Sequence, residues 1–410
     1  MPRPNSLDLN WFRAHLVQDI LPHWLEGAAT PAGLFFPRLD RQWRRQPDQV
    51  ATLVSQSRLL YNFANGYEAT GDEPYLQAVR NGARYLIDHF RDPEHGGWFF
   101  SVAPPSVLDA HPEAAIVPEV DRARALPGSA AVLDDRKDSY GHAFVVFGLA
   151  HAAQCTGDDA YRQAAADTWA TIQAKLTDEH GGLKLRTSGD FSTGEPGRSQ
   201  NPMMHLFEAL LALGDLPDME HVHDDARRVA DFVRSRLVRE RDHCLPEVYG
   251  DDWTELPSEE GGRLDLGHAF EWAFLLSSAA ERGLGEADLG HAERFLEYGM
   301  QLGYDHASGG IFSPASPDGS SVRQTKGWWE QCEAIRALLH FAALREHDDL
   351  WAPLQGTVDF VKRELLDHEH GGWYSGSWTP VSGVTKHDKG SEWKVDYHVV
   401  GMCVEAARWA

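Results

Sequence analysis

Histidine recurs at a fixed interval in three apolar segments of this sequence. His142, His205 and His268 follow one another at intervals of 63 residues, and apolar residues surround each at helical spacing. A single histidine in such a segment is more often a buried structural residue than a catalyst. Three at one repeated position indicate a shared task, because an imidazole exchanges protons near neutral pH. The pattern therefore predicts histidines that face one cavity.

The repeat extends to three further segments. The corresponding position holds Arg58 in the first segment, Glu330 or Gln331 in the fifth, and His398 in the last. Each of these residues titrates or forms hydrogen bonds, whereas a purely structural repeat would place Ala or Leu there. We expect all six positions to point toward the same cavity.

Glutamate follows three of these positions at a spacing of three residues. Residues at that spacing share one face of a helix. A carboxylate beside an imidazole fixes the tautomer and raises the basicity of the ring, so we expect Glu271 to orient His268. The alternative is that the glutamates bind the ends of neighbouring helices. The three glutamates are Glu208, Glu271 and Glu333.

A second motif alternates with the histidine segments. An acidic turn precedes Gly-Gly, and an aromatic or β-branched run follows it, as in PEHGGWFF and HEHGGWYS. This composition is typical of a tight turn before a short strand. We expect the histidines of these motifs to be turn residues without a role in chemistry. They are His95, His180, His306 and His370, with a weaker version of the motif at His243.

Two helical patterns lie between successive Gly-Gly turns. The predicted inner helices are 56–69, 141–154, 203–213, 268–282, 329–345 and 397–409, and their outer partners are 76–90, 162–176, 224–237, 288–302, 350–366 and 7–25. Six pairs predict an all-α fold, an (α/α)6 barrel with short β-hairpins or loops at one end. An open solenoid is the alternative. Closure is favoured because the first and last helices form one pair, which makes residues 1–410 a single catalytic domain.

One interval between Gly-Gly turns is longer than the others. It measures 85 residues instead of 63 or 64, and the additional residues fall in 101–137, which is rich in Ala, Pro and Asp. A long irregular insertion is often functional. We expect a lid or rim over the cavity; a disordered surface segment is the alternative.

Composition excludes several classes of function. The formal net charge is −24, which argues against nucleic acid or an anionic membrane as a partner, because phosphates require a basic surface. No signal-peptide core is present and no apolar run is long enough to span a bilayer. The four cysteines are far apart and form no C-x-x-C motif, which favours a reducing compartment. We expect a cytoplasmic protein.

Three kinds of chemistry fit several histidines, an arginine and glutamates. A zinc site would need the ring to bring the histidines together, since the sequence holds no H-x-x-x-H or H-E-x-x-H motif. Glycoside hydrolysis would use two carboxyls and leave the histidines without a task; its candidates are Asp138, Asp251, Asp252, Glu330 and Glu392. Proton transfer next to a carbonyl fits best, because arginine or a second histidine can stabilise the enediolate oxygen.

At these positions the sequence resembles the N-acylglucosamine 2-epimerase superfamily of sugar 2-epimerases and aldose–ketose isomerases. The resemblance runs along nearly the whole chain. It implies an (α/α)6 barrel, no metal and no nicotinamide or other cofactor, and a histidine acid/base pair at His268 and His398. The matching segments are QSRLLYNF (56–63), SYGHAF (139–144), RSQNPMMHLFEA (198–209), LGHAFEWAFLL (266–276), KGWWEQCEA (326–334) and KVDYHVVGMC (394–403).

Within this superfamily the NPMMHLFEA segment looks more like the mannose isomerases. We therefore expect interconversion of D-mannose and D-fructose through a cis-enediol, with His398 moving a proton between C2 and C1. His268 would assist ring opening and Arg58 would hold the oxyanion. The residues expected to bind substrate are His142, Asn201, His205, Trp328, Trp329, Glu330 and Glu333.

Other activities and the assembly state stay open. A 2-epimerase acting on cellobiose, mannose/glucose or an N-acylglucosamine is the main alternative, and a glycoside hydrolase or a carbohydrate-binding barrel is a weaker one. The expected partner is a monosaccharide substrate, and the expected assembly is a monomer or a homodimer.

Overall fold

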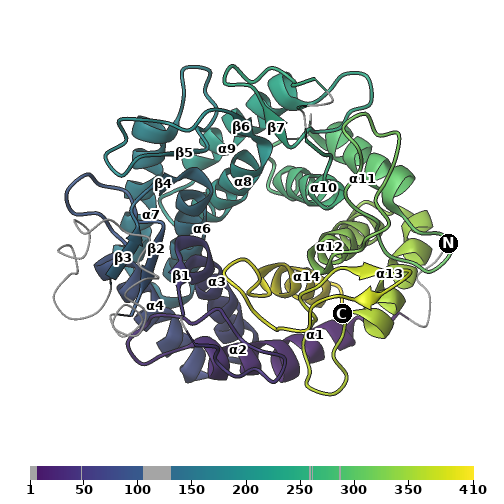
Figure 1. Cartoon of the computed structure of the whole chain (residues 1–410), viewed down its shortest axis with the longest axis horizontal. Helices are drawn as coiled ribbons and strands as arrows, with labels where there is room; N and C mark the ends of the chain where they lie inside the picture. The colour runs from purple at the N-terminus through teal and green to yellow at the C-terminus, as the bar shows by residue number, and fades with distance from the viewer. Residues whose placement is uncertain (1–6, 48, 105–130, 258–259, 261, 286–287) are drawn as a thin grey trace.

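Helices dominate the structure and stand around a common centre. The computed structural model describes residues 7–47, 49–104, 131–257, 260, 262–285 and 288–410. Seen down the ring axis, one set of helices surrounds the centre and a second set lies outside it (Figure 1). The inner helices are α3 (Leu53–Thr70), α6 (Ser139–Thr156), α8 (Gln200–Gly214), α10 (Leu266–Glu281), α12 (Trp328–Leu344) and α14 (Tyr397–Ala407).

Each inner helix has an outer partner, which confirms the predicted (α/α)6 barrel. Every predicted helix is present, with ends within three residues of those expected. The outer set is α4 (Glu73–His89), α7 (Asp159–Thr171) with η3 (Ile172–Leu176), α9 (Val222–Phe232) with η4 (Val233–Leu237), α11 (Leu289–Gly303), η6 (Asp348–Leu350) with α13 (Trp351–Glu364), and the N-terminal series α1 (Asn10–His15), η1 (Leu16–Ile20) and α2 (Leu21–Ala28).

The two sets of helices differ in burial because they occupy different places in the ring. In α6, consecutive residues from Ala143 to Ala150 are all buried, so this inner helix has no solvent-facing side. In α4, buried Leu76, Val79 and Ala83 alternate with exposed residues in the pattern of an amphipathic surface helix. The inner helices therefore form the core between the outer ring and the central cavity.

The ring closes where the two ends of the chain meet. Helix α14 packs against both α12 and α3, and α1 packs on its outer side. The indole N–H of Trp24 donates to the Asp396 carboxylate at 2.8 Å, directly before α14. The indole N–H of Trp373 donates to His15 Nε2 at 2.9 Å. These contacts select the closed barrel over the open solenoid.

The inner helices begin at residues that cap their first turn. Thr52 and Ser55 form a reciprocal capping box before α3. Side-chain oxygens of Asp138, Ser199 and Asp265 accept backbone N–H groups at the starts of α6, α8 and α10. Because the histidines of the repeat lie in the first two turns of these helices, the caps hold all of them near one end of the ring.

The Gly-Gly motifs form the predicted turns. Each closes an antiparallel bridge, such as Arg91 with Trp98, and Gly96 and Gly97 have φ of 79° and 67°. The aspartate that starts each turn pairs with a basic residue leading into the next inner helix. These pairs are Asp92–Lys137, Asp178–Arg198, Asp305–Lys326 and Asp367–Lys389, at 2.7–2.8 Å.

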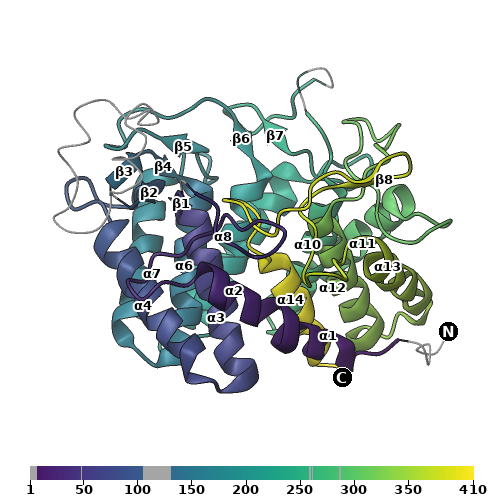
Figure 2. The same cartoon turned by 60° about the horizontal axis from the view of Figure 1, so that its bottom comes forward.

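Short strands gather at the end of the ring where the inner helices begin (Figure 2). All of their pairings are antiparallel. Residues 105–130 lie outside the described residues, so the lid expected over 101–137 stays a prediction. The paired strands are β1 (Ala51–Thr52) with β2 (Ser101–Ala103) and β3 (Ala131–Asp134), β4 (Lys137–Asp138) with β5 (Arg186–Thr187), β6 (Arg198–Ser199) with β7 (Val248–Tyr249), and β8 (Trp378–Thr379) with β9 (Gly383–Val384).

Candidate active site

A cavity of about 1190 Å³ opens at the end of the ring that carries the strands. Most of the side chains predicted to form the site line it, and they come from inner helices that are far apart in sequence. The predicted residues that line the cavity are Arg58, Asn201, His205, His268, Trp328, Trp329, Glu330 and His398. The sequence repeat therefore places its polar positions around one space.

His398 lies in the first turn of α14 beside both tryptophans of α12. Its ring centroid is 5.7 Å from that of Trp328 and 5.4 Å from that of Trp329. Its Nδ1 lies 2.7 Å from Oε1 of Glu333. Burial, followed by the positive charge of Arg58, lowers the pKa of His398 well below 6.5. A neutral ring that donates Nδ1–H to Glu333 keeps the Nε2 lone pair available as a base.

His268 has the opposite protonation state. Burial lowers the pKa of its ring, but the carboxylate of Glu247, with Nδ1 at 2.8 Å from Oε1, outweighs burial and raises the pKa to about 10. The centroid of the imidazole is 5.0 Å from that of Trp329. His268 is therefore a charged acid at neutral pH, and Trp329 lies beside both histidines.

Glu247, and not Glu271, orients His268, which corrects the prediction from spacing. Glu271 does follow His268 at three residues, but its carboxylate is fully buried and approaches His205 Nδ1 at 4.0 Å. Glu247 belongs to the neighbouring repeat, directly before β7. A spacing of three residues shows only that two side chains share one side of a helix. It cannot reveal a partner that another element supplies.

Gln200 holds the Glu247 carboxylate in place. The indole N–H of Trp272 donates to Gln200 Oε1 at 2.8 Å, which fixes the orientation of the amide. The amide nitrogen then donates to the Glu247 carboxylate, with both oxygens at 3.2 Å. All of these groups are buried, so the acid has a fixed orientation.

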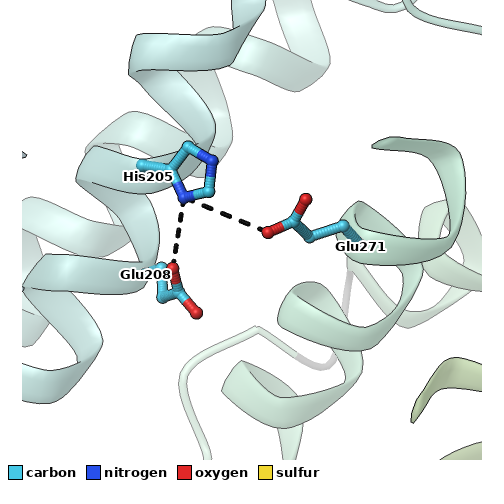
Figure 3. Close-up of side chains that lie close together, drawn as sticks. All are labelled: His205, Glu208 and Glu271. Atoms are coloured by element: carbon cyan, nitrogen blue, oxygen red, sulfur yellow. Dashed lines mark hydrogen bonds and ion pairs between the residues drawn. The ribbon is translucent and has the colours of Figure 1, made fainter. Parts of the chain in front are cut away.

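His205 faces the cavity from α8 and belongs to a third histidine–glutamate pair. Its Nδ1 is 3.2 Å from Oε2 of Glu208, which also accepts a hydrogen bond from the Tyr397 hydroxyl. Burial lowers the pKa of His205 to about 4. The ring is therefore neutral and can bind a hydroxyl group. Figure 3 shows it between Glu208 and Glu271.

Arg58 brings the permanent positive charge of this wall. It donates to the Tyr140 hydroxyl at 2.6 Å and to the carbonyl of Trp393 at 2.9 Å. The guanidinium carbon lies 4.3 Å from the Phe144 ring centroid and 4.9 Å from that of Tyr397. Such a held cation can stabilise an oxyanion without reorganising.

His142 does not line the cavity, which corrects its assignment to substrate binding. The ring is fully buried, and Nδ1 lies 2.8 Å from the backbone carbonyl of Asp138. The backbone N–H of Trp98 donates to Nε2 at 3.1 Å. Both nitrogens are therefore used to fasten a Gly-Gly turn to α6, and neither remains for a ligand.

Two of the predicted glutamates lie below the cavity surface. Glu271 and Glu333 are fully buried, and Glu333 contacts His398 without lining the space itself. Glu330 does line the cavity, and burial raises its pKa to about 8. Together with the histidines, these side chains form two groups with ligand atoms close enough for a metal ion: His205, Glu208 and Glu271, and Glu271, Glu333 and His398.

Several residues of the site were not found from the sequence. Tyr140 lies in the SYGHAF segment and Gln200 in the segment before His205, so their motifs were noted without their roles. Glu247 lies in the weakest copy of the Gly-Gly motif, LPEVY, where only its position before a short strand gave a signal. Trp393 stands half exposed at the cavity rim, 55% accessible, and precedes the KVDYH segment.

Comparison of the sequence with known families agrees with this geometry. The profile of the N-acylglucosamine 2-epimerase family matches residues 33–114 and 123–402. The chain belongs to this family. The resemblance inferred from the motifs is thereby confirmed, and with it the assignment to enzymes that isomerise or epimerise sugars.

Characterised relatives carry more than one activity. The chain is 23% identical to a D-mannose isomerase of Marinomonas mediterranea over 98% of each chain. It is 27% identical to a cellobiose 2-epimerase of Bacteroides fragilis over 95% of this chain and 96% of that protein. Both relatives match nearly end to end.

Solved structures show the same fold. A crystal structure of a D-mannose isomerase superposes with a TM-score of 0.85 at 22% identity, covering 99% of this chain and all of that one. The cellobiose 2-epimerase of Spirochaeta thermophila gives 0.84 at 25% identity, covering 99% and 98%. None of the helices within the described ranges is long and apolar enough to cross a bilayer.

Proposed function

We propose that this protein is an aldose–ketose isomerase that interconverts D-mannose and D-fructose through a cis-enediol. The observation that carries the proposal is the pair His268 and His398. They face one cavity, each beside Trp329, with pKa values shifted in opposite directions. Groups whose pKa values are pushed apart divide into an acid and a base.

The base of this pair begins the reaction. His398 Nε2 takes the proton from C2 of the open-chain aldose, and the C2–H electrons form the C1=C2 double bond. The carbonyl oxygen at C1 takes a proton from His268, which gives the enediol. His268, now neutral, takes the O2 proton as the C2=O bond forms, and His398 returns its proton to C1, which yields the ketose and restores both rings. Arg58 would stabilise the negative charge that develops on the oxygen.

The remaining wall of the cavity would hold the sugar. His205 is neutral and Asn201 lies beside it on α8, so both can bind hydroxyl groups. Trp328 and Trp329 offer flat apolar surfaces to the ring. Several relatives are D-mannose isomerases, from three organisms at 23–29% identity, which supports this substrate.

A 2-epimerase is the second candidate, and the size of the cavity favours it. The volume of about 1190 Å³ exceeds the roughly 300–1,000 Å³ of ordinary small-molecule sites, so a disaccharide would fit. In that reaction the proton leaves one face of C2 and returns to the other, which requires a proton donor on each face. The relatives named cellobiose 2-epimerase support this alternative.

The product formed in D₂O distinguishes the two reactions. We expect mannose to give fructose with solvent deuterium at C1, because the base exchanges its proton before returning it. NMR spectroscopy of the products measures both the sugar and the label. Glucose, the C2 epimer of mannose, as the main product would replace the isomerase with the epimerase, and sugar binding without any deuterium incorporation would reject both.

We also propose that the enzyme works in the cytoplasm as a monomer or homodimer. All four cysteines are free, and three of them are buried, which is compatible with a reducing compartment. Light scattering of the purified protein would determine the assembly.

A further inference from the structure

A fully buried carboxylate below the sugar cavity has no hydrogen-bond partner among the described residues. Both oxygens of Glu271 are unpaired, although the side chain has no exposed surface. Buried polar groups in folded proteins are nearly always satisfied, by protein groups, water or an ion. The unsatisfied Glu271 carboxylate therefore requires an explanation from the groups around it.

Those surroundings supply further metal ligands at suitable distances. His205 Nδ1 is 3.2 Å from Glu208 Oε2 and 4.0 Å from Glu271 Oε1, and Figure 3 shows both carboxylates directed at that nitrogen. Zinc binds nitrogen and oxygen at about 2.0–2.2 Å, so ligand atoms in a tetrahedral site lie roughly 3.3–3.5 Å apart. A small movement of the Glu271 carboxylate toward His205 Nδ1 would bring the two ligand atoms to that separation.

We propose that His205, Glu208 and Glu271 form a Zn²⁺-binding site, through which the metal inhibits the enzyme. The mixture of one imidazole and two carboxylates suits zinc, whereas magnesium and calcium prefer oxygen alone. His205 lines the cavity, which gives the ion an entry path. A bound ion would hold this ring away from the sugar, a consequence that rests on the proposed function.

Zinc at this site requires the His205 tautomer in which Nδ1 carries the lone pair and the ring proton is on Nε2.

The charges around the site set its strength. Arg336 of α12 lies 3.9 Å from Glu208 and 3.6 Å from Glu333 and opposes a cation. Arg58 of α3 and the charged His268 of α10 also oppose it, whereas Glu333 of α12 favours it. Tyr140 of α6 and Tyr397 and His398 of α14 face the group as neutral side chains.

The test measures zinc binding without any sugar, so it does not depend on the proposed reaction. We expect calorimetry with ZnCl₂ to show one saturable site per chain. Glu271→Gln removes one ligand without changing the shape of the side chain. It should weaken binding by more than the roughly 10–100-fold caused by loss of an outer partner. Glu94→Gln, beside His95 on the surface, is the matched control and should bind as wild type.

A spectroscopic measurement and a second variant support the test. X-ray absorption of the zinc-loaded wild type should show nitrogen and oxygen ligands without sulfur, and His205→Gln serves if Glu271→Gln does not fold. The proposal is wrong if the wild type shows no saturable site, if the Glu271 variant binds equally well, or if a cysteine sulfur coordinates the ion. Binding as expected without inhibition of turnover would reject the inhibitory role alone.

Discussion

His268 and His398 differ in charge because the glutamates that contact them have different neighbours. Glu247 is held by the Gln200 amide and adds a negative charge next to His268. Glu333 contacts Arg336 as well as His398, so its charge is partly balanced, and Arg58 adds a positive charge nearby. A difference in the second partner thus decides which imidazole carries the positive charge.

Glu247→Gln should lower the pKa of His268 from about 10 toward its ordinary value. A raised pKa keeps the acid charged up to that pH, so the variant should lose activity at a lower pH on the alkaline side. Its activity at acidic pH should change less. The measurements are the pH profile of kcat/KM and NMR titration of the imidazole.

Glu271→Gln is the comparison for this prediction, because spacing alone would have assigned Glu271 the same role. Glu271 is also close to His268, but its own pKa is raised well above the usual range, so its carboxyl adds little charge and only a small shift is expected. An alkaline limb that moves with Glu271→Gln and stays in place with Glu247→Gln would contradict the structure.

The sequence could predict the polar positions of the inner helices that line the cavity, but it could not predict their individual partners. The repeat predicted that His205 and His268, 63 residues apart, and His398 face one cavity, and all three line it, because repeated helices put equivalent positions at similar depth. It failed for His142, whose nitrogens are taken by backbone groups of a turn. It also missed Glu247, because contacts between repeats leave no trace in spacing within a helix.

At the scale of elements, the Gly-Gly turns position the inner helices. Gly96 and Gly97 both have the left-handed conformation, but an added Cβ at Gly96 meets nothing within 4 Å. One at Gly97 would lie 2.8 Å from His142 Nε2 and 2.9 Å from the Phe191 ring. Substitution at Gly96 therefore tests the backbone requirement alone, whereas substitution at Gly97 also tests the packing of the turn on α6.

Gly97→Ala should destabilise the protein more than Gly96→Ala. Both variants pay the left-handed cost of roughly 1–2 kcal/mol, and only Gly97→Ala must also displace the imidazole that accepts the Trp98 N–H. Thermal unfolding of the two variants measures the difference. Equal melting temperatures would show that His142 does not fasten this turn.

At the scale of the whole molecule, Asp396 takes part both in closure of the ring and in the placement of His398. Asp396 accepts the Trp24 indole N–H at 2.8 Å and Lys394 Nζ at 2.6 Å, two residues before His398. Its backbone is left-handed, with φ of 57°. The N-terminal helices thus help to place the first turn of α14.

Trp24→Phe should reduce stability by about 1–3 kcal/mol, because it leaves a buried carboxylate short of a donor, and should also reduce kcat. Trp169→Phe removes the same kind of bond, from Trp169 Nε1 to Asp225 at 2.8 Å, between outer helices away from the closure. It should lower stability without lowering kcat. Denaturant unfolding measures the stability of both variants, and steady-state kinetics measures their kcat. If both variants lost kcat to the same extent, ring closure would have no specific effect on the site.

The buried ion pairs of the Gly-Gly turns bear on how such a ring can evolve. Each joins the turn of one repeat to the segment that begins the next inner helix, and Lys137, Lys326 and Lys389 have no exposed surface. Loss of one partner from a buried pair costs about 3–5 kcal/mol. Deleting or duplicating a repeat would separate such partners and reopen the circle. An open solenoid can gain or lose units over time, whereas this architecture keeps its repeat number and can vary only through its loops.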